Sequence, residues 1–394
     1  MVDVAISGAG PAGTALAIHL GRSGFRVALF ERATFPREKP CGEGLMPLGV
    51  AALDELGVPT RELGADFFGA RYSAGGRVAE GDFPPGSTPG RGLRRRDLDA
   101  ALALLASRTP GVSLHTGARV TAPLLEDGRV RGLLVEGQPV RARLVVAADG
   151  AQSRLRHSLG LSLPAPRKRI GMRMHFRSAA GTPARTRIEI FLAPGRELYL
   201  TPLPRGEFLV AALAQAAALQ GSPETSFRNW CLAVPALAER VQDAEPVSDL
   251  LVTAPLSGRA RRRVLPGCVL LGDAAGFTDP ITGGGMAQAL QSARLLAAHL
   301  AAQGDWSLAV LDEFDRRREA LLRDYRRVTS ALLWLARHPF LIPPALGLLR
   351  SIPAFFSHLL GVSGGVRGLF RLSPPPLPAA APRPVSALQE QLTS

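Results

Sequence analysis

Six residues near the beginning of the chain have the types and spacing that bind a dinucleotide. Three glycines form a GxGxxG pattern between a predicted strand over residues 2–7 and a predicted helix over 11–23, and a carboxylate ends the next strand, 26–31. The glycines let the backbone approach a pyrophosphate, the helix N-terminus supplies positive potential, and the carboxylate accepts hydrogen bonds from ribose hydroxyls. A glycine-rich turn without function is the alternative. The predicted cofactor-binding residues are Gly8, Gly10, Pro11, Ala12, Gly13 and Glu31, with Arg32 beside the carboxylate.

A second glycine-rich segment lies between a strand predicted over Val264–Leu271 and a helix predicted from Met286 to about Ala302. Its residues 272–276 (GDAAG) and 279–286 (DPITGGGM) resemble the second FAD motif of the para-hydroxybenzoate hydroxylase superfamily, including its geranylgeranyl reductase branch. This resemblance indicates FAD rather than NAD as the resident cofactor. A carboxylate at the strand end can bind ribityl or ribose hydroxyls, and the helix dipole stabilises negative charge on reduced flavin. The candidate residues are Asp273, Pro280, Gly283, Gly284, Gly285 and Met286.

Two further motifs resemble the same superfamily and occur in its order along the chain. The first is residues 95–99 (RRDLD), where the resemblance places Arg95 against the pyrophosphate or the ribityl chain. Arg94 or Arg96 is the equivalent if the match slips by one residue, and a solvated helix start is the alternative. The second is residues 148–156 (ADGAQSRLR), where the resemblance associates Asp149 with the flavin ribose and Arg156 with use of a nicotinamide cofactor. A structural turn after a strand remains a rival explanation.

The clearest candidate for a catalytic residue is Cys41. It lies in residues 35–45 (FPREKPCGEGL), which resemble the geranylgeranyl reductase branch, whose members carry a Cys-Gly pair beside the flavin. A thiol there could donate a proton, and a nearby Lys39 would lower its pKa. Alternatively, Cys41 and Gly42 are small residues that only permit close approach of the backbone to the ring, and we favour this positioning role.

The substrate side departs from that branch. Its isoprenoid reductases show a Tyr-x-Trp-x-Phe-Pro stretch, whereas this chain has Tyr-Leu-Thr-Pro-Leu-Pro over residues 199–204. The predicted substrate residues are Tyr199 and Thr201, and the missing aromatics favour a smaller or more polar ligand than a long prenyl chain. Alternation along 172–177 puts Arg173, His175 and Arg177 on one face of a strand. That face lines a pocket or is solvated, and we expect it to be solvated.

Composition excludes several classes of protein. The net charge is +14, but the basic residues are scattered, and the cluster over 259–263 lacks interleaved aromatics, so we expect no nucleic-acid partner. Three separate cysteines give neither a disulfide framework nor a metal site, and the seven histidines have no metal-binding spacing. We expect a cytoplasmic protein without a signal peptide, because a strand begins at the N-terminus, and no apolar run is long enough for a membrane span.

The predicted fold class is α/β: a Rossmann-like FAD-binding domain with a parallel sheet, an interleaved and mostly antiparallel substrate domain, and C-terminal helices. The FAD-binding domain covers 1–160 and 256–303, the substrate domain 161–255 and the C-terminal helical region 304–372. A proline-rich tail over 373–394 is predicted to be disordered. Residues 331–362 form apolar helices that either pack against the flavin domain, which we favour, or rest on a membrane surface.

These motifs favour an FAD-dependent monooxygenase that hydroxylates or epoxidises an apolar or aromatic small molecule with molecular oxygen. Only one dinucleotide fingerprint is present, so NADH or NADPH would bind transiently as the reductant. One alternative is a reductase of carbon–carbon double bonds in prenyl lipids. Another is a flavin-binding electron carrier or sensor without substrate chemistry.

Overall fold

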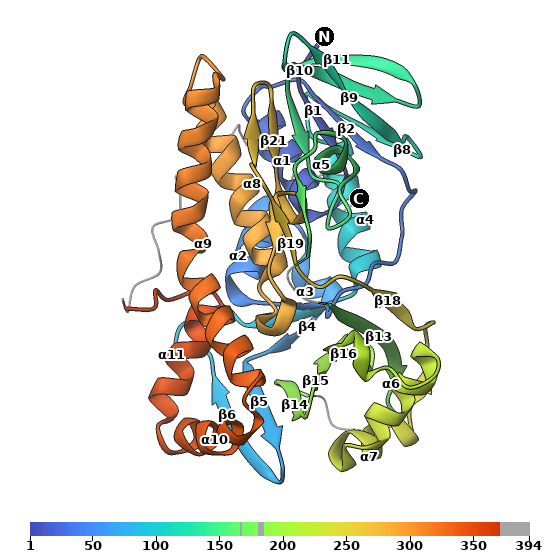
Figure 1. Cartoon of the computed structure of the whole chain (residues 1–394), viewed down its shortest axis with the longest axis vertical. Helices are drawn as coiled ribbons and strands as arrows, with labels where there is room; N and C mark the ends of the chain where they lie inside the picture. Colours follow the sequence, from blue (N-terminus) through green and yellow to red (C-terminus); the bar gives the residue numbers. More distant parts are fainter. Residues whose placement is uncertain (166–167, 180–184, 371–394) are drawn as a thin grey trace.

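The computed structural model describes residues 1–165, 168–179 and 185–370, and its first sheet is largely parallel. The strand order is β20-β21-β11-β1-β2-β8, with β10 and β9 continuing as an antiparallel hairpin from β11 (Figure 1). The strands β1, β2, β8, β11 and β21 run parallel, as the βαβ pattern predicts. Their bounds are β1 Val2–Ser7, β2 Val27–Glu31, β8 Val112–Thr116, β9 Val120–Glu126, β10 Arg129–Val135, β11 Gln138–Ala147, β20 Val264–Leu265 and β21 Cys268–Leu270.

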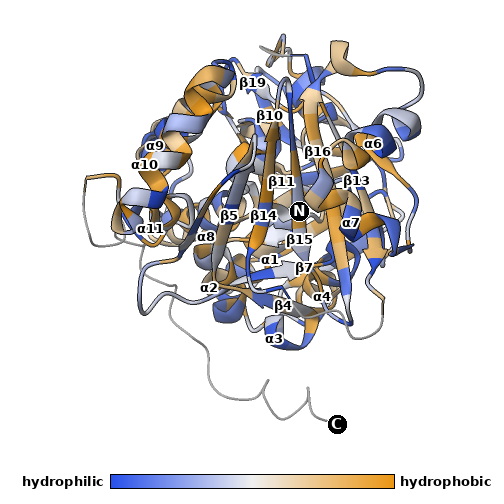
Figure 2. Ribbon diagram, turned by 90° about the horizontal axis from the view of Figure 1, so that it is seen from below, coloured by the Kyte–Doolittle hydropathy of each residue, from blue (hydrophilic) through white to orange (hydrophobic). Residues whose placement is uncertain are grey.

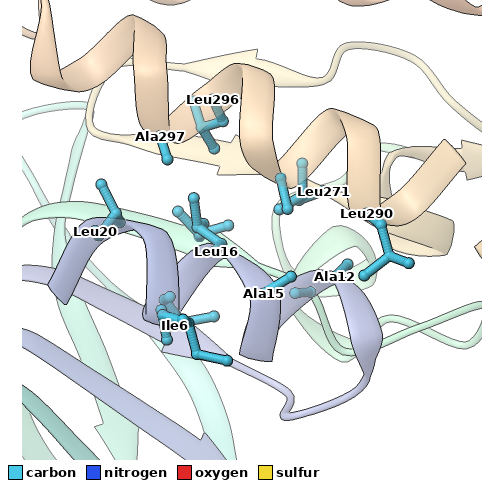
Figure 3. Packing of buried hydrophobic residues seen from close by; sticks show 14 of the residues in the cluster. Ile6, Ala12, Ala15, Leu16, Leu20, Leu271, Leu290, Leu296 and Ala297 are labelled. Atoms are coloured by element: carbon cyan, nitrogen blue, oxygen red, sulfur yellow. The ribbon is translucent and has the colours of Figure 1, made fainter. Parts of the chain in front are cut away.

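Two helices that are far apart in the sequence pack together over this sheet. They are α1 (Pro11–Arg22) and α8 (Gly285–Ala301), and apolar side chains three or four residues apart line their contact. Figure 3 shows Leu16 and Leu20 of α1 facing Leu296 of α8, all fully buried. Burying one such leucine contributes about 1.5–3 kcal/mol. This contact fixes the two glycine-rich loops relative to each other, because each loop leads directly into one of the helices.

One predicted strand is wrong in its extent. Residues 264–271 do not form one strand, because β20 and β21 pair antiparallel as a hairpin across Pro266 and Gly267. Proline cannot donate to a ladder, and Gly267 has a φ of +76°, which favours glycine. The turn therefore follows from the two residue types that interrupt the apolar run.

The second sheet is mostly antiparallel, in the order β17-β13-β16-β15-β14-β5-β6, with β18 paired to β13. The pair of β14 and β5 is parallel. Helices α6 (Pro223–Leu232) and α7 (Pro235–Gln242) cover one face of this sheet, at the lower right of Figure 1. The strands are β5 Gly69–Ala74, β6 Arg77–Asp82, β13 Arg169–Arg177, β14 Ile188–Ala193, β15 Arg196–Pro202, β16 Glu207–Gln215, β17 Glu245–Pro246 and β18 Leu251–Thr253.

The antiparallel second sheet and the parallel first sheet confirm the predicted fold class, although β5 and β6 come from the first 160 residues of the chain. The division into domains stays a prediction. Two three-stranded sheets complete the β structure, β3-β7-β4 and β12-β19-β22. Their strands are β3 Gly44–Leu45, β4 Gly64–Phe67, β7 Gly90–Leu93, β12 Ser162–Leu163, β19 Gly258–Ala260 and β22 Gly276–Phe277.

The remaining helices surround the sheets. They are α2 Pro47–Leu56, α3 Thr60–Leu63, α4 Arg95–Ser107 and α5 Arg154–Ser158, with the short 3₁₀ turns η1 Ala216–Ala218, η2 Gly272–Ala275 and η3 Pro280–Thr282. Each of α1, α2, α6 and α7 has proline in its first turn, where the missing N–H removes no hydrogen bond.

The C-terminal region is helical as predicted, and the segments after α9 begin at or next to prolines. It contains α9 (Leu308–Ala336), η4 (Pro339–Leu341), α10 (Ile342–Ser351) and α11 (Pro353–Ser363). In Figure 2 these helices lie together at one edge of the molecule. Among the described residues, no single helix is long and apolar enough to cross a membrane; one pair, 308–336 with 339–351, meets that criterion together but is bent by 104°. The predicted disordered tail, 373–394, lies outside the described residues.

Candidate functional site

The two glycine-rich loops end at helix N-termini that have no side-chain cap. Gly10 and Gly284 are the N-cap residues of α1 and α8, and neither helix has an acidic residue in its first turn. Their first N–H groups therefore keep their positive potential for an anionic or electron-rich ligand. Gly8 has a φ of +100° and a Cβ there would lie 2.5 Å from the Ala148 carbonyl oxygen, so only glycine fits.

The space beside other glycines is open. A Cβ built on Gly10, Gly42, Gly283 or Gly285 meets no heavy atom within 4 Å. At Gly13, in contrast, a Cβ would lie 2.0 Å from the carbonyl oxygen of Gly8, which shows that this glycine serves packing between helix and strand. The backbone around the four open positions can thus be approached closely by a ligand.

Glu31 is buried at the end of β2 and holds the first glycine loop. Its carboxylate accepts hydrogen bonds from the N–H groups of Ala9 at 3.0 Å and Ala33 at 3.1 Å, and it pairs with Arg37 at 3.4 Å. Arg32, the next residue, is exposed. The carboxylate is therefore fixed at the end of β2 beside the first glycine loop.

Asp149 has one oxygen without a protein partner. Its Oδ2 accepts a hydrogen bond from the Leu155 N–H at 3.2 Å, whereas Oδ1 is buried and unpaired. Arg156, from the same motif, donates to the carbonyl oxygens of Asp273 at 3.2 Å and Ala274 at 3.1 Å. The motif over 148–156 is thus tied to the second glycine-rich segment, and a buried unpaired oxygen needs a donor such as a ligand hydroxyl.

Asp273 follows β21 and is surrounded by cations. Burial raises the pKa of its carboxyl, and Arg95, Arg156 and Lys39 oppose that rise. Gly272 lies against Ala12, since a Cβ on it would be 2.9 Å from the Ala12 Cβ. The second glycine-rich segment therefore lies against the first, with Arg95 and Arg156 near Asp273.

Arg95 begins α4 and makes two contacts. Its guanidinium forms a bidentate pair with Asp99, at 2.9 and 2.7 Å, and also hydrogen-bonds to the Cys41 thiol. Arg94 instead pairs with Glu207 at 3.1 Å, and Arg96 is exposed beside Asp97. Among these three arginines, Arg95 is the one seen to contact Cys41, and its role as the cofactor-binding arginine stays a prediction.

The Cys41 thiol is neutral in this environment. Burial raises its pKa, while Arg95 acts in the opposite direction, and the Glu43 N–H donates to Sγ at 3.4 Å. The expectation that Lys39 gives the thiol a lowered pKa is wrong, because the pKa is raised. The cation that opposes this rise most is Arg95. Burial lowers the pKa of Lys39 itself. A protonated thiol can donate a proton, which a thiolate cannot.

A buried carboxylate and imidazole lie behind the Cys41 loop. Glu43 has a φ of +58°, an unfavourable value for this residue type, and both of its oxygens are bound. Oε1 accepts the Arg95 N–H at 3.0 Å, and Oε2 contacts the His175 Nε2 at 2.7 Å. His175 Nδ1 lies 3.0 Å from the Ser248 hydroxyl and 2.9 Å from Arg173.

The expectation that Arg173 and His175 face solvent is therefore wrong. Both are buried, and this face of β13 turns toward the Cys41 loop rather than outward. Only Arg177, at the end of the strand, remains half exposed. The alternation correctly placed the three side chains on one face, but the partner that buries them comes from a distant part of the sequence.

Tyr199 and Thr201 on β15 touch the two flavin-side loops. The Thr201 hydroxyl donates to the Gly42 carbonyl oxygen at 2.9 Å, and the Tyr199 hydroxyl donates to the Ile281 carbonyl oxygen at 3.2 Å. Burial raises the pKa of Tyr199 well above its ordinary value, so the phenol is neutral. These two residues therefore lie where the second sheet meets the Cys41 loop and the segment before α8.

A second buried group of charges holds that segment. Arg169 on β13 pairs with Asp279 at 3.0 Å and with Glu197 on β15. Burial raises the pKa of Glu197 to about 7, against the influence of Arg169. From the other side, the Tyr325 hydroxyl of α9 accepts the Gly284 N–H at 3.2 Å and contacts Thr282. The loop that begins α8 is thus fixed by both the second sheet and the C-terminal helices.

The sequence did not identify four residues that belong to the site, which are Glu43, His175, Arg169 and Tyr325. An acidic residue between two glycines was a signal for Glu43, because such a side chain needs a partner if the loop is buried. No local pattern identifies Arg169 or Tyr325. Met286, predicted as a cofactor contact, packs against the core at the start of α8.

Comparisons with known proteins agree with this geometry. The FAD binding domain family matches residues 1–328. The chain is 30% identical to a menaquinone reductase of Mycobacterium tuberculosis, over 82% of this chain and 85% of that protein. It is also 30% identical to a digeranylgeranylglycerophospholipid reductase of Methanocella arvoryzae, over 81% and 83% of the two chains. A 6-methylpretetramide 4-monooxygenase of Streptomyces rimosus is 33% identical over 75% and 74%.

A crystal structure of a flavoprotein/dehydrogenase from Cytophaga hutchinsonii has the same fold, with a TM-score of 0.78, 23% identity and 92% coverage of each chain. The site fits FAD: the uncapped helix N-termini suit its pyrophosphate and ring, the open glycines admit it, and the unpaired Asp149 oxygen suits a ribose or ribityl hydroxyl. The chain belongs to the FAD binding domain family and is an FAD-dependent oxidoreductase of the para-hydroxybenzoate hydroxylase superfamily, in its geranylgeranyl reductase-like branch.

Proposed function

We propose that this chain reduces a carbon–carbon double bond in a lipophilic substrate such as a prenyl chain, with Cys41 as the proton donor. The observation that supports this proposal is the neutral Cys41 thiol, held by Arg95 and by the Glu43 N–H. Relatives that are 30% identical to the chain are named as reductases of menaquinone and of digeranylgeranylglycerophospholipid, which agrees with a reductive reaction on a lipophilic substrate. It replaces the monooxygenase that the motifs favoured, because that reaction gives the thiol no chemical task.

FAD, once reduced by NADH or NADPH, would supply the hydride that one carbon of the double bond receives. The other carbon takes the proton from the Cys41 Sγ–H, and the product is the saturated chain. The sulfur is left as a thiolate, which the adjacent Arg95 guanidinium stabilises, and it regains a proton from solvent. Glu43 and His175 position this loop. Glu43 accepts the Arg95 backbone N–H, and the contact with His175 holds the Glu43 side chain while its backbone keeps a positive φ.

On this proposal, Tyr199 and Thr201 orient the substrate between β15 and the flavin. Both hydroxyls already contact loop carbonyl oxygens, so they keep the Cys41 loop and the α8 loop at a fixed separation. The apolar side of the site is formed by Ile188, Ile190 and Tyr72, which suits a hydrocarbon chain.

The test begins with protein whose flavin has been reduced without oxygen and then mixed with a prenyl quinone in detergent. Anaerobic reoxidation of the flavin, together with a product that is still two mass units heavier after its quinone ring has been reoxidised in air, is the result expected of a double-bond reductase. Cys41→Ala should slow this reoxidation by about 10²–10⁴-fold with normal FAD content, as expected for loss of a general acid. Cys231→Ala, in the buried core of the second sheet, is the matched control and should react normally.

A monooxygenase remains the second candidate, because a monooxygenase from Streptomyces rimosus is the relative with 33% identity. The same preparation distinguishes it. Rapid mixing of the reduced protein with oxygenated buffer would give a transient flavin hydroperoxide spectrum, and the prenyl quinone would leave the anaerobic flavin reduced. That pair of results would overturn the reductase proposal, as would unchanged kinetics in Cys41→Ala.

A further inference from the structure

We propose that the outer face of the C-terminal helices docks on the surface of an anionic lipid bilayer. Five large apolar side chains between residues 334 and 355 are between 40% and 72% exposed, and we call them the apolar face. They come from the end of α9, from η4, from α10, from the residue that joins α10 to α11, and from the first turn of α11. The members are Trp334, Phe340, Leu348, Ile352 and Phe355.

The helices that carry this face are apolar on both sides. Ile342 and Leu346 of α10 and Phe356 and Leu360 of α11 are buried against the second sheet. The opposite side carries the exposed residues, and 351–355 (SIPAF) are exposed in succession. A helix that is hydrophobic on all sides normally contacts apolar groups on all sides. Exposure of this large apolar area to water is therefore unfavourable.

Charge identifies the partner. The sequence has no aspartate or glutamate between Asp324 and Glu390, while Arg337 and Arg350 lie exposed among the apolar side chains. Exposed aromatic and aliphatic side chains flanked by arginines are the composition of helices that lie in the interface of an anionic membrane. Trp334 also stacks close to His338, with 4.5 Å between ring centroids, and an indole is well suited to the headgroup region.

A second copy of the chain fits this face less well. In a twofold dimer the same patch meets itself, so the arginines of both copies would lie in one interface. Residues 325–370, which carry the face, contain no carboxylate that could neutralise them. A bilayer with anionic headgroups supplies both the apolar layer and the negative charge.

The position of this face suits the site. The inner side of α10 and α11 packs on β5 and β6, and Phe356 contacts Tyr72 with 5.8 Å between ring centroids. Tyr72 belongs to the apolar cluster that also includes Ile188 and Tyr199. One layer of helix therefore separates the docking face from the apolar cluster that includes Tyr199. The docking itself does not depend on the reaction type.

Tryptophan fluorescence offers a direct test, because Trp230 and Trp306 are each 4% exposed whereas Trp334 is 55% exposed. The full chain with FAD bound is mixed with vesicles of phosphatidylglycerol and phosphatidylcholine, or of phosphatidylcholine alone. We expect a blue shift of the emission and quenching by brominated acyl chains with the anionic vesicles. Both signals should disappear in Trp334→Phe, which keeps the other two tryptophans.

Vesicle flotation of variants separates the apolar contribution to binding from the electrostatic one. Phe340→Ser with Phe355→Ser should abolish binding, and Arg337→Gln with Arg350→Gln should weaken it by on the order of fivefold for each arginine. The matched controls are Leu125→Ser and Arg141→Gln, at exposed positions on β9 and β11 at the opposite end of the molecule (Figure 1), and they should bind normally.

Absence of flotation with anionic vesicles would overturn the proposal, and so would equal losses in the controls. A dimer in sedimentation velocity that Phe340→Ser dissociates, without vesicle binding, would assign the face to a second copy instead. Binding is measured here without turnover. A failure of docking is therefore distinguishable from a failure of the reductase proposal, which is measured in detergent.

Discussion

Two buried groups of charged side chains connect the second sheet to the flavin loops, and they are built differently. The Cys41 anchor consists of Glu43, His175 and the Arg95 backbone, and it fixes the loop before β3. The Asp279 anchor consists of Arg169, Glu197 and Asp279, and it fixes the segment before α8. Both begin on β13, six residues apart along one strand.

The difference lies in how many carboxylates share one cation. In the Cys41 anchor a single carboxylate has a partner on each oxygen, so no group competes for it. In the Asp279 anchor one guanidinium pairs with two buried carboxylates. Burial raises the pKa of Glu197 to about 7, Arg169 opposes this rise, and the second carboxylate, Asp279, adds to it. The second anchor contains a carboxyl whose pKa, about 7, lies near neutrality.

The largest effect should come from Arg169→Met. This change leaves Glu197 and Asp279 buried without their common cation, and removal of one partner from a buried ion pair costs about 3–5 kcal/mol. We expect a loss of that size in the free energy of unfolding in urea. Arg141→Met, which removes a pair with Glu126 at the surface, is the control and should leave stability unchanged. A loss below about 1 kcal/mol at Arg169 would mean that the two carboxylates are not both charged.

Glu197→Gln should change how stability depends on pH. The folded pKa of Glu197, about 7, lies above the ordinary value of 4.5, so the folded state holds this proton more tightly than the unfolded state. Its contribution is fully present below pH 4.5 and is lost as the pH rises through 7. The loss is on the order of 3 kcal/mol.

Glutamine does not titrate, so the free energy of unfolding of the native chain minus that of the variant should fall by this amount between pH 4.5 and 8. Urea unfolding of both proteins at several pH values measures the difference, and titration of other groups cancels in it. A constant difference across the range would contradict the shared-cation explanation.

The sequence predicted those parts of the fold that depend on local pattern. The strand, glycine loop and helix over 2–23 were evident, because apolar periodicity and the positions of glycine and proline determine them within a short window. The parallel pairing of β14 with β5 was not, because strands far apart in the chain meet there. The β20–β21 hairpin was missed because an apolar run on both sides of Pro266 reads as one strand.

The site residues also divide into those that a local motif identifies and those that it does not. Gly8, Gly13, Glu31 and Asp273 could be proposed as site residues because one motif contains the residue and the element that positions it. His175 was expected to face solvent, since its partner Glu43 lies 132 residues away and no pattern on β13 shows it. Charged residues on a strand face have no defined burial until the fold supplies the partner.

The smallest effect should come from His175→Gln in the Cys41 anchor, because an amide N–H can still donate to Glu43. We expect a cost of about 1 kcal/mol in the free energy of unfolding, less than at Arg169. Alkylation of Cys41 by iodoacetamide reports on loop position, since Cys41 is partly exposed whereas Cys231 and Cys268 are buried. A change of about 1 kcal/mol in the free energy that keeps the loop in place corresponds to about a fivefold change in alkylation rate. The FAD content of the variant should be normal. Equal alkylation rates in the native chain and the variant would show that His175 stabilises the fold without positioning the thiol, and the two anchors would then differ in strength alone.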